Sequence, residues 1–288
     1  MKVLAPAKVN FTLEVFGRRS DGYHALRSVV MPISLADELD VELTNDGSLS
    51  SDTGYDDDLC LKAARLLKCQ VVSLADGLGA RIRVTKRIPA GGGLGGGSAD
   101  AAAVLRALNE LWRLGLTRTE LAELGAQVGS DVPALVLGGP VLMEGRGEQV
   151  SPLEPEGAPL PSLNLVLANP GVASSTPEVY AACTPRASGG PSATAAMIAA
   201  LGTGDLGAIA DALQNDLQEP AVRLHPEIGA ALTALRAAGA TGVTMSGSGA
   251  SVFGLVPDAA TAAHLAAELT ANGLAAWAVA TGEKRVNG

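Results

Sequence analysis

The strongest constraint in the sequence is a glycine-rich run at residues 89–100, PAGGGLGGGSAD, in which six glycines surround one leucine. A glycine in ordered structure costs roughly 0.5–1 kcal/mol relative to alanine, so such a run indicates close backbone approach or a turn that a β-carbon forbids. The run leads directly into residues 98–115, where apolar positions recur at helical spacing and Gly115 is a helix stop. The sequence therefore predicts a tight loop that opens a helix, with Ser98 as the N-cap.

A loop of this kind is suited to binding an anion. The first N–H groups of a helix have no partner within it, and together with the helix dipole they attract negative charge. A flexible surface loop before an ordinary capped helix is the alternative, but a linker rarely runs straight into so strong a helix. We therefore expect a phosphate chain to bind at Pro89, Ala90, Gly91, Gly92, Gly93, Leu94, Gly95, Gly96, Gly97, Ser98 and Ala99.

Two common phosphate motifs fit the run poorly. Residues 91–96 formally satisfy the GxGxxG pattern of dinucleotide-binding folds, in which the first strand runs directly into the first glycine. Here residues 86–89 intervene, and a long stretch of mixed structure comes first. The P-loop pattern also fails, because no lysine follows the glycines. A dehydrogenase is therefore disfavoured.

Composition excludes some classes of function. The net charge is −9 and no basic block is present, which argues against a general nucleic-acid binder, although a small anionic ligand remains compatible. No apolar run is long enough to cross a bilayer, and the first residues do not resemble a signal peptide, so we expect a cytoplasmic protein. Three cysteines without metal-site spacing are expected to be reduced thiols: Cys60, Cys69 and Cys183.

Both halves of the chain mix strands and helices without regular βαβ alternation, which favours an α+β fold. The first half is expected to contain strands at 2–17, 37–45 and 80–88 and helices at 56–68, 98–115 and 117–129, the last opened by a Thr117–Glu120 capping box. The second half is expected to contain strands at 164–169, on both sides of 246–251 and at 274–281, with helices at 192–201, 204–216, 226–238 and 258–272. The proline-rich segment 151–162 is the best linker candidate, and 184–196 is expected to be a mobile surface loop.

Three segments resemble the GHMP kinases, the small-molecule kinases that include galactokinase, homoserine kinase and mevalonate kinase. Residues 89–100 fit the family's phosphate loop with one extra glycine, residues 5–26 carry its Pro-Ala-Lys-x-Asn element, and MSGSGASVFGL at 245–255 fits its third motif. The resemblance implies two lobes: a ribosomal-protein-S5-domain-2-like lobe at 1–155 and a ferredoxin-like lobe at 156–288. It also implies ATP as cofactor, with Mg²⁺ carried by the nucleotide.

Within that family, the segments RSDGYH and GSDVP and the expanded glycine loop resemble the branch that acts on a methylerythritol carrying a CDP group. The resemblance implies transfer of the ATP γ-phosphoryl group to the 2-hydroxyl of that substrate, in the non-mevalonate route to isoprenoids. A GHMP kinase for another alcohol, such as homoserine or mevalonate, and a non-catalytic nucleotide sensor remain the alternatives.

The resemblance also assigns roles to particular residues. Asp131 would be the general base, although by composition alone it reads as a helix N-cap followed by Pro133. Lys8 would hold Asp131 ionised and steady the developing charge, although a lone strand lysine is usually exposed. The substrate-binding residues implied are Asn10, Tyr23, His24, Thr176, Gly247 and Gly249.

Two of these assignments carry specific alternatives. Tyr23 and His24 would frame the cytosine, but His24 also fits a satisfied turn histidine, and 246–251 fits a tight strand-to-strand turn. Asp58 stands where the family usually has an asparagine. Because a carboxylate only accepts hydrogen bonds, Asp58 could accept from the adenine amine but could not donate to the base.

Overall fold

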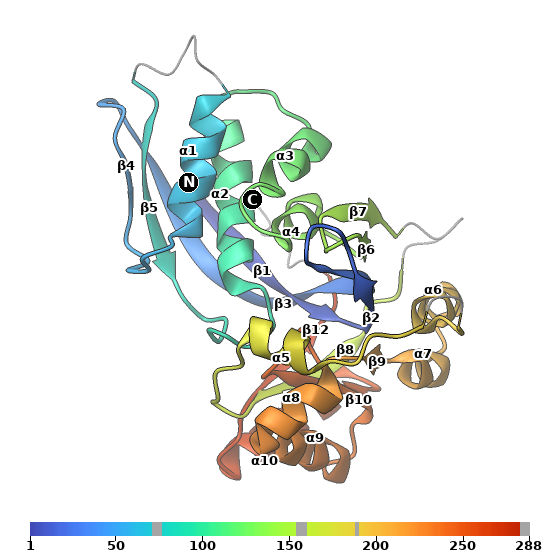
Figure 1. Ribbon diagram of the computed structural model, residues 1–288. Helices are drawn as coiled ribbons and strands as arrows, with labels where there is room; N and C mark the ends of the chain where they lie inside the picture. Colours follow the sequence, from blue (N-terminus) through green and yellow to red (C-terminus); the bar gives the residue numbers. More distant parts are fainter. Residues whose placement is uncertain (71–76, 154–159, 188–189, 283–288) are drawn as a thin grey trace.

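Two β-sheets organise the computed structural model, which describes residues 1–70, 77–153, 160–187 and 190–282. The larger sheet belongs mainly to the first half of the chain and the smaller one to the second half (Figure 1). Runs of helices cover each sheet, so the expected two-lobed α+β fold is confirmed. The expected boundary between residues 155 and 156, and half of the linker at 151–162, lie outside the described residues.

The larger sheet is built around one long strand, β3 (His24–Thr44). β3 pairs antiparallel with β1 (Lys2–Asn10), β2 (Thr12–Arg18), β5 (Gly79–Thr85) and β6 (Val141–Glu144). β4 (Leu49–Ser51) and β7 (Gln149–Pro152) extend the two ends. The expected strand at 37–45 is therefore only the last part of β3, and the expected strand at 2–17 is two strands separated at Phe11.

Four helices pack on or beside this sheet: α1 (Leu59–Cys69), α2 (Gly96–Leu111), α3 (Arg118–Gly125) and α4 (Val132–Leu137). The small alanines of α2 let the helix lie close against β1 and β3, and most of its residues are buried. The Thr117–Glu120 capping box forms as predicted, with both reciprocal hydrogen bonds. α1 begins later than expected because Asp58 caps it.

The smaller sheet is antiparallel, in the order β10 (Thr241–Met245), β11 (Val252–Val256), β8 (Asn164–Asn169) and β12 (Ala275–Ala280). Its apolar strands form a second core with α9 (Pro226–Ala237) and α10 (Ala259–Ala271). The remaining helices of this half are α5 (Thr176–Ala182), α6 (Ala193–Thr203), α7 (Leu206–Ala212) and α8 (Gln218–Leu224).

The two halves interlock through β9 (Gln214–Asn215), which pairs in parallel with β2. The backbone N–H groups of Gln214 and Asp216 donate to the carbonyls of Phe11 and Leu13. These bonds end α7 at Ala212, so the single helix expected at 204–216 was wrong in its second part. A short edge pairing of this kind leaves no periodic pattern in the sequence.

The expected mobile loop at 184–196 is wrong in its last part, 193–196, which is helical, and the part before it is anchored by ion pairs. The Arg186 guanidinium forms ion pairs with Glu14 and Asp216, and α6 already begins at Ala193. Glu14, almost fully buried, accepts hydrogen bonds from the Ala193 and Thr194 N–H groups. Residues 188–189 lie outside the described residues.

Across the described ranges, every helix is too short or too polar to cross a membrane. The thiols of Cys60, Cys69 and Cys183 are all free, in agreement with the sequence-based expectation.

Candidate active site

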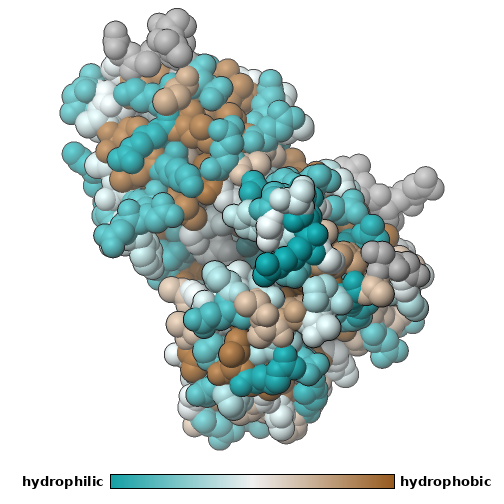
Figure 2. Space-filling view, in the orientation of Figure 1, coloured by the Kyte–Doolittle hydropathy of each residue, from teal (hydrophilic) through white to brown (hydrophobic). Residues whose placement is uncertain are grey.

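A pocket of about 820 Å³ lies where the glycine-rich loop, β1 and the first turns of α5 meet. Figure 2 shows the molecule hollowed between its upper and lower parts. Every residue expected at the site lines this pocket except Ala99, which is buried behind the loop in the second turn of α2. The structure therefore brings the N-terminal motif, the glycine-rich loop and the third motif at 245–255 together around one cavity.

The glycine-rich loop is fixed by three consecutive backbone carbonyls. Gly92 O accepts from the Ser251 N–H, Gly93 O from the Ser246 hydroxyl, and Leu94 O from the Lys8 N–H, each at 3.0 Å. With these carbonyls turned into the protein, the N–H groups of residues 91–98 find no acceptor anywhere in the described chain. Their donors remain available to a ligand in the pocket.

Three glycines of the loop adopt a left-handed backbone: Gly91, Gly93 and Gly95, with φ of 64°, 72° and 70°. Gly95 is the N-cap of α2, so the helix begins at Gly96 and the expected N-cap role of Ser98 was wrong. Ser98 lies inside the first turn, where its N–H joins the unpartnered donors at the helix start. The anion site predicted from the glycines thus rests on backbone donors.

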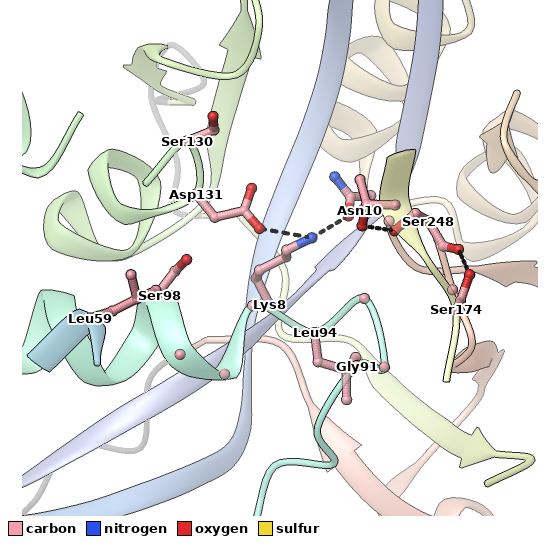
Figure 3. A pocket seen from close by; sticks show the side chains of 18 of the residues that line it. Lys8, Asn10, Leu59, Gly91, Leu94, Ser98, Ser130, Asp131, Ser174 and Ser248 are labelled. Carbon is pink, nitrogen blue, oxygen red and sulfur yellow. Dashed lines mark hydrogen bonds and ion pairs between the residues drawn. The ribbon is translucent and has the colours of Figure 1, made fainter. Parts of the chain in front are cut away.

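Lys8 and Asp131 form an ion pair that lines the pocket (Figure 3). Lys8 Nζ lies 3.5 Å from Asp131 Oδ2 and donates to Asn10 Oδ1 at 2.7 Å. Lys8 is buried, whereas one third of the Asp131 side chain is exposed to the pocket. The pair adjoins the loop, because a β-carbon placed on Gly95 would lie 3.3 Å from the Lys8 side chain and 3.5 Å from Asp131 Oδ2.

The structural alternatives for these two residues are met only in the position of Asp131. Asp131 occupies the N-cap position of α4, but its carboxylate makes no capping hydrogen bond. Lys8 is not an exposed strand residue, since only 5% of its side chain is accessible. Among the described residues, the Asp131 carboxylate is thus paired with the Lys8 ammonium, makes no capping hydrogen bond and stays partly exposed in the pocket.

Asn10 connects this pair to the rest of the site. Its amide nitrogen donates to the Ser28 hydroxyl at 2.8 Å, which leaves its oxygen to accept from Lys8. The backbone N–H of Asn10 also points to the Ser246 hydroxyl, at 3.4 Å. Asn10 therefore sets the direction of the Lys8 ammonium, in addition to lining the pocket itself.

The other end of the pocket is aromatic. The His24 and Tyr180 rings stack with centroids 5.9 Å apart, and the Arg146 guanidinium lies 5.3 Å from the centroid of Tyr23. His24 Nδ1 lies 3.0 Å from the Phe16 carbonyl, so this histidine is held by the turn and also faces the cavity. Burial, followed by the charge of Asp131, raises the pKa of Tyr180 and keeps its phenol neutral.

A group of hydroxyls closes the side formed by the second half of the chain. The Thr176 and Ser248 hydroxyls lie 2.7 Å apart, and the Ser174 hydroxyl donates to the Ser248 carbonyl (Figure 3). Gly247 lies against the glycine-rich loop, since a β-carbon there would be 3.0 Å from Gly93 O and 3.3 Å from Lys8 Nζ. The segment 246–251 is thus both a turn between β10 and β11 and a wall of the pocket.

Asp58 lines the pocket, but its carboxylate is engaged with the protein. Oδ1 accepts from the N–H groups of Cys60 and Leu61, and Oδ2 accepts from the Thr53 hydroxyl at 2.6 Å. Burial works to raise the pKa of Asp58, but these hydrogen bonds outweigh it and lower the pKa overall. The residue is foremost the N-cap of α1.

Some pocket residues escaped the sequence reasoning: Tyr180, Arg146, Ser174 and Ser248. Tyr180 is one of only three tyrosines in a chain with 3% aromatic residues, and that scarcity was a usable signal. Arg146 stands in an ordinary turn and offers no pattern. The two serines could be recognised only from the fold, which places the start of α5 against the third motif.

Comparisons with known proteins agree with this geometry. The GHMP kinases N terminal domain matches residues 58–139, and the GHMP kinases C terminal domain matches residues 197–275. A 4-diphosphocytidyl-2-C-methyl-D-erythritol kinase from Symbiobacterium thermophilum is 42% identical over 287 residues, covering 98% of this chain and 99% of its own. A protein of the same name from Brevibacillus brevis is 42% identical over 262 residues, covering 89% and 87%.

Solved structures show the same fold. A crystal structure of 4-(cytidine 5'-diphospho)-2C-methyl-D-erythritol kinase superposes with a TM-score of 0.83 at 39% identity, covering 98% of this chain and 99% of that one. A homoserine kinase from Cytophaga hutchinsonii gives a TM-score of 0.73 at 21% identity, covering 98% and 94%, and so shares the fold.

The chain belongs to the GHMP kinase family and is an ATP-dependent kinase that acts on an alcohol. Within that family it belongs to the 4-diphosphocytidyl-2-C-methyl-D-erythritol kinase branch, as the relatives that span nearly its whole length show.

Proposed function

We propose that this protein transfers the γ-phosphoryl group of ATP to the 2-hydroxyl of 4-(cytidine 5'-diphospho)-2-C-methyl-D-erythritol, within the non-mevalonate isoprenoid pathway. The observation that carries the proposal is the loop itself: the carbonyls of residues 92–94 are anchored to the protein, and the N–H groups of residues 91–98 have no acceptor among the described residues. These donors and the start of α2 suit a triphosphate, and they adjoin the Lys8–Asp131 pair.

Phosphoryl transfer requires in-line positioning, neutralisation of the charge on the transferred group, and removal of the hydroxyl proton. Asp131 accepts the proton of the 2-hydroxyl as general base, since its carboxylate is open to the pocket and unused by the helix. The Lys8 ammonium lies 3.5 Å from Asp131 Oδ2, at the place where negative charge develops on the phosphoryl oxygens. Asn10 fixes the orientation of that ammonium.

The aromatic end of the pocket accounts for the substrate. A cytosine ring fits against Tyr23, His24 and Tyr180, because stacking on aromatic rings holds a base without requiring charge. Arg18 and Arg146 line the same end and supply positive charge for the diphosphate. Homoserine and mevalonate carry neither a base nor a diphosphate, so these features disfavour them as substrates. Thr176, Gly247 and Gly249 would close around the methylerythritol.

Mg²⁺ bound to nucleotides keeps several waters and uses the phosphates plus one or two carboxylates. No group of three histidine, cysteine or acidic side chains suited to a metal occurs among the described residues. A metal in this pocket would be held chiefly by the phosphates of the nucleotide. Such a metal would neutralise charge on the phosphates.

The test is ADP release from MgATP with four alcohols: the CDP-bearing methylerythritol, methylerythritol 4-phosphate without the cytidine, homoserine and mevalonate. We expect turnover of the first substrate only. Comparable turnover of homoserine or mevalonate would overturn the substrate assignment. ATP binding without ADP release from any of the four would favour the nucleotide-sensor alternative.

A further inference from the structure

A network of three charged residues lies beneath the glycine-rich loop and takes no part in the proposed chemistry. Lys86 Nζ donates to Asp37 Oδ2 at 2.5 Å and to Asp100 Oδ2 at 2.7 Å. Asp37 is fully buried on β3, and 3% of the Asp100 side chain is exposed on α2. The network joins the sheet, the segment before the loop and the helix after it.

Its hydrogen bonds fix both ends of the loop. Asp37 Oδ1 accepts from the N–H groups of Arg87 and Ile88, which immediately precede the loop. Asp100 lies in the second turn of α2, which immediately follows the loop. A β-carbon on Gly96 would lie 3.5 Å from Lys86 Nζ, so the ammonium sits directly under the helix start. Lys86 thereby ties residues 86–88 to the turn that presents the free N–H groups.

One carboxylate oxygen of the network has no hydrogen-bond donor among the described residues. Asp100 Oδ1 is buried and has no hydrogen-bond partner in the described structure, and Asp100 lines the nucleotide side of the pocket. Two carboxylates share a single ammonium, so the network carries one negative charge when both are ionised. A buried charge without full pairing is costly, and gaining a proton is the simplest relief.

We propose that the Asp37–Lys86–Asp100 network is a proton-linked positioning device for the phosphate loop, in which Lys86 fixes the loop and Asp100 binds a proton when a triphosphate is gripped. The inference rests on the proposed phosphate site at residues 91–98. It adds that nucleotide binding takes up a proton at a residue that never touches the reacting atoms.

The charges around Asp100 support the linkage. Burial raises the pKa of Asp100 to about 7, against the opposing pull of the Lys86 ammonium and with the help of the neighbouring Asp37 charge. From α1, the Cys60 thiol and Asp58 face the same space. With Asp100 protonated the network is neutral, and with Asp100 ionised it adds negative charge beside an incoming polyanion.

The other elements that pack on α2 contribute charge elsewhere. On β1 and before α4, Lys8 and Asp131 stand on the pocket side of the loop. α3, which carries Glu120 and Glu123, meets α2 farther along, where Gly125 approaches Leu105. The proton linkage is therefore assigned to Asp100 alone.

The experiment is calorimetric titration with a non-hydrolysable MgATP analogue between pH 6 and pH 8.5, comparing wild type with Asp100→Asn. The protonation of the nucleotide changes with pH in the same way in both titrations. The ratio of the two dissociation constants therefore reports the contribution of Asp100. We expect wild-type affinity to fall by about threefold or more across this range relative to Asp100→Asn, since an ionised Asp100 repels the phosphates. At pH 7, titration in two buffers of different ionisation enthalpy should show greater proton uptake by wild type.

Asp56→Asn is the matched control, because Asp56 is exposed and should leave the pH dependence as in wild type. A ratio that does not change with pH, or equal proton uptake in wild type and Asp100→Asn, would overturn the inference while leaving the phosphate site intact. Failure of wild type to bind the analogue at all would instead remove the proposed phosphate site. If Asp100→Asn does not fold, wild type binding without proton uptake beyond that of the nucleotide alone is the contradicting result.

The positioning role of Lys86 has its own readout. Lys86→Met should raise the KM for ATP by about tenfold or more, as expected for lost preorganisation of the loop, with the KM for the alcohol within about twofold. Lys86→Arg, which keeps a cation between the two carboxylates, should recover part of the loss. Equal increases in both KM values, or no recovery by arginine, would contradict a role confined to the loop.

Discussion

The hydroxyl of Ser246 donates to the carbonyl of Gly93 at 3.0 Å, across a sequence separation of 153 residues. The same hydroxyl lies 3.4 Å from the N–H of Asn10 on β1. One buried side chain from the second half of the chain thus fixes the glycine-rich loop against the strand that carries Lys8. The free N–H groups of the loop depend on this contact between the two halves.

Gly93→Ala should disrupt this arrangement. Gly93 has a φ of 72°, and a β-carbon there would overlap the Ser246 carbonyl oxygen. We expect backbone strain and displacement of the third motif to lower the free energy of unfolding by about 1–3 kcal/mol. The affinity for ATP should also fall, because the loop amides are displaced. Denaturant unfolding and nucleotide titration measure the two effects.

Gly202→Ala is the control for that experiment. Gly202 lies in α6, has open space around its Cα and has no positive φ. Alanine there should be neutral or stabilising by about 0.5–1 kcal/mol, because glycine is costly in a helix. A Gly93→Ala protein as stable as Gly202→Ala would contradict the packing described for the loop.

Tyr180→Leu should weaken binding of the CDP-bearing substrate without affecting ATP. Removing the ring that stacks on His24 takes away one wall of the aromatic end. Base–aromatic stacking contributes about 1–3 kcal/mol, so the KM for the alcohol should rise by about fivefold to a hundredfold. Tyr180→Phe keeps the ring and should stay near wild type. Steady-state kinetics with each substrate varied in turn would reveal an increase shared by ATP, which this account does not allow.

Asp58→Ala should destabilise α1 by about 1 kcal/mol at neutral pH, the usual cost of losing an N-cap. Asp58→Asn keeps a capping oxygen and should cost much less. The pKa of Asp58 is lowered in the folded state, so its ionised form contributes stability above its ordinary pKa of 3.8. That contribution is lost as the pH falls through the lower folded-state value.

Unfolding curves measured from pH 3 to pH 7 test this pH dependence. Asp58→Asn should remove the part of the acid destabilisation that Asp58 causes, whereas Asp56→Asn, at an exposed neighbour, should not. Identical acid profiles for wild type and Asp58→Asn would show that the cap is not ionic.

The sequence was most informative where one residue type has one physical use. Glycines are costly inside a helix or strand, and the structure gives three of those in 91–97 left-handed backbones, in a loop whose N–H groups have no acceptor among the described residues. The capping box at Thr117 was equally readable, because its two hydrogen bonds depend only on local spacing. Ser98 was misjudged because serine usually precedes a helix, whereas here Gly95 takes the cap.

What the sequence concealed depends on tertiary contact. The Lys8–Asp131 pair joins residues from β1 and the start of α4, and only the family resemblance suggested it in advance. Tyr180 and Arg146 reach the pocket through the packing of α5 and the turn after β6, which no periodicity encodes. β9, only two residues long, forms because β2 offers a free edge.

The measurement that bears most directly on the proposed mechanism compares Asp131→Asn with wild type in nucleotide binding and in turnover. Asparagine keeps the shape of the side chain but cannot accept the hydroxyl proton, so kcat should fall by about 10²–10⁴-fold. The dissociation constant for MgATP should stay within about threefold, because the phosphates are held by the loop amides. Asp211→Asn, at an exposed position on α7, is the control for a simple loss of charge. Turnover of Asp131→Asn within about tenfold of wild type would contradict the assignment of the base, and with it the proposed mechanism.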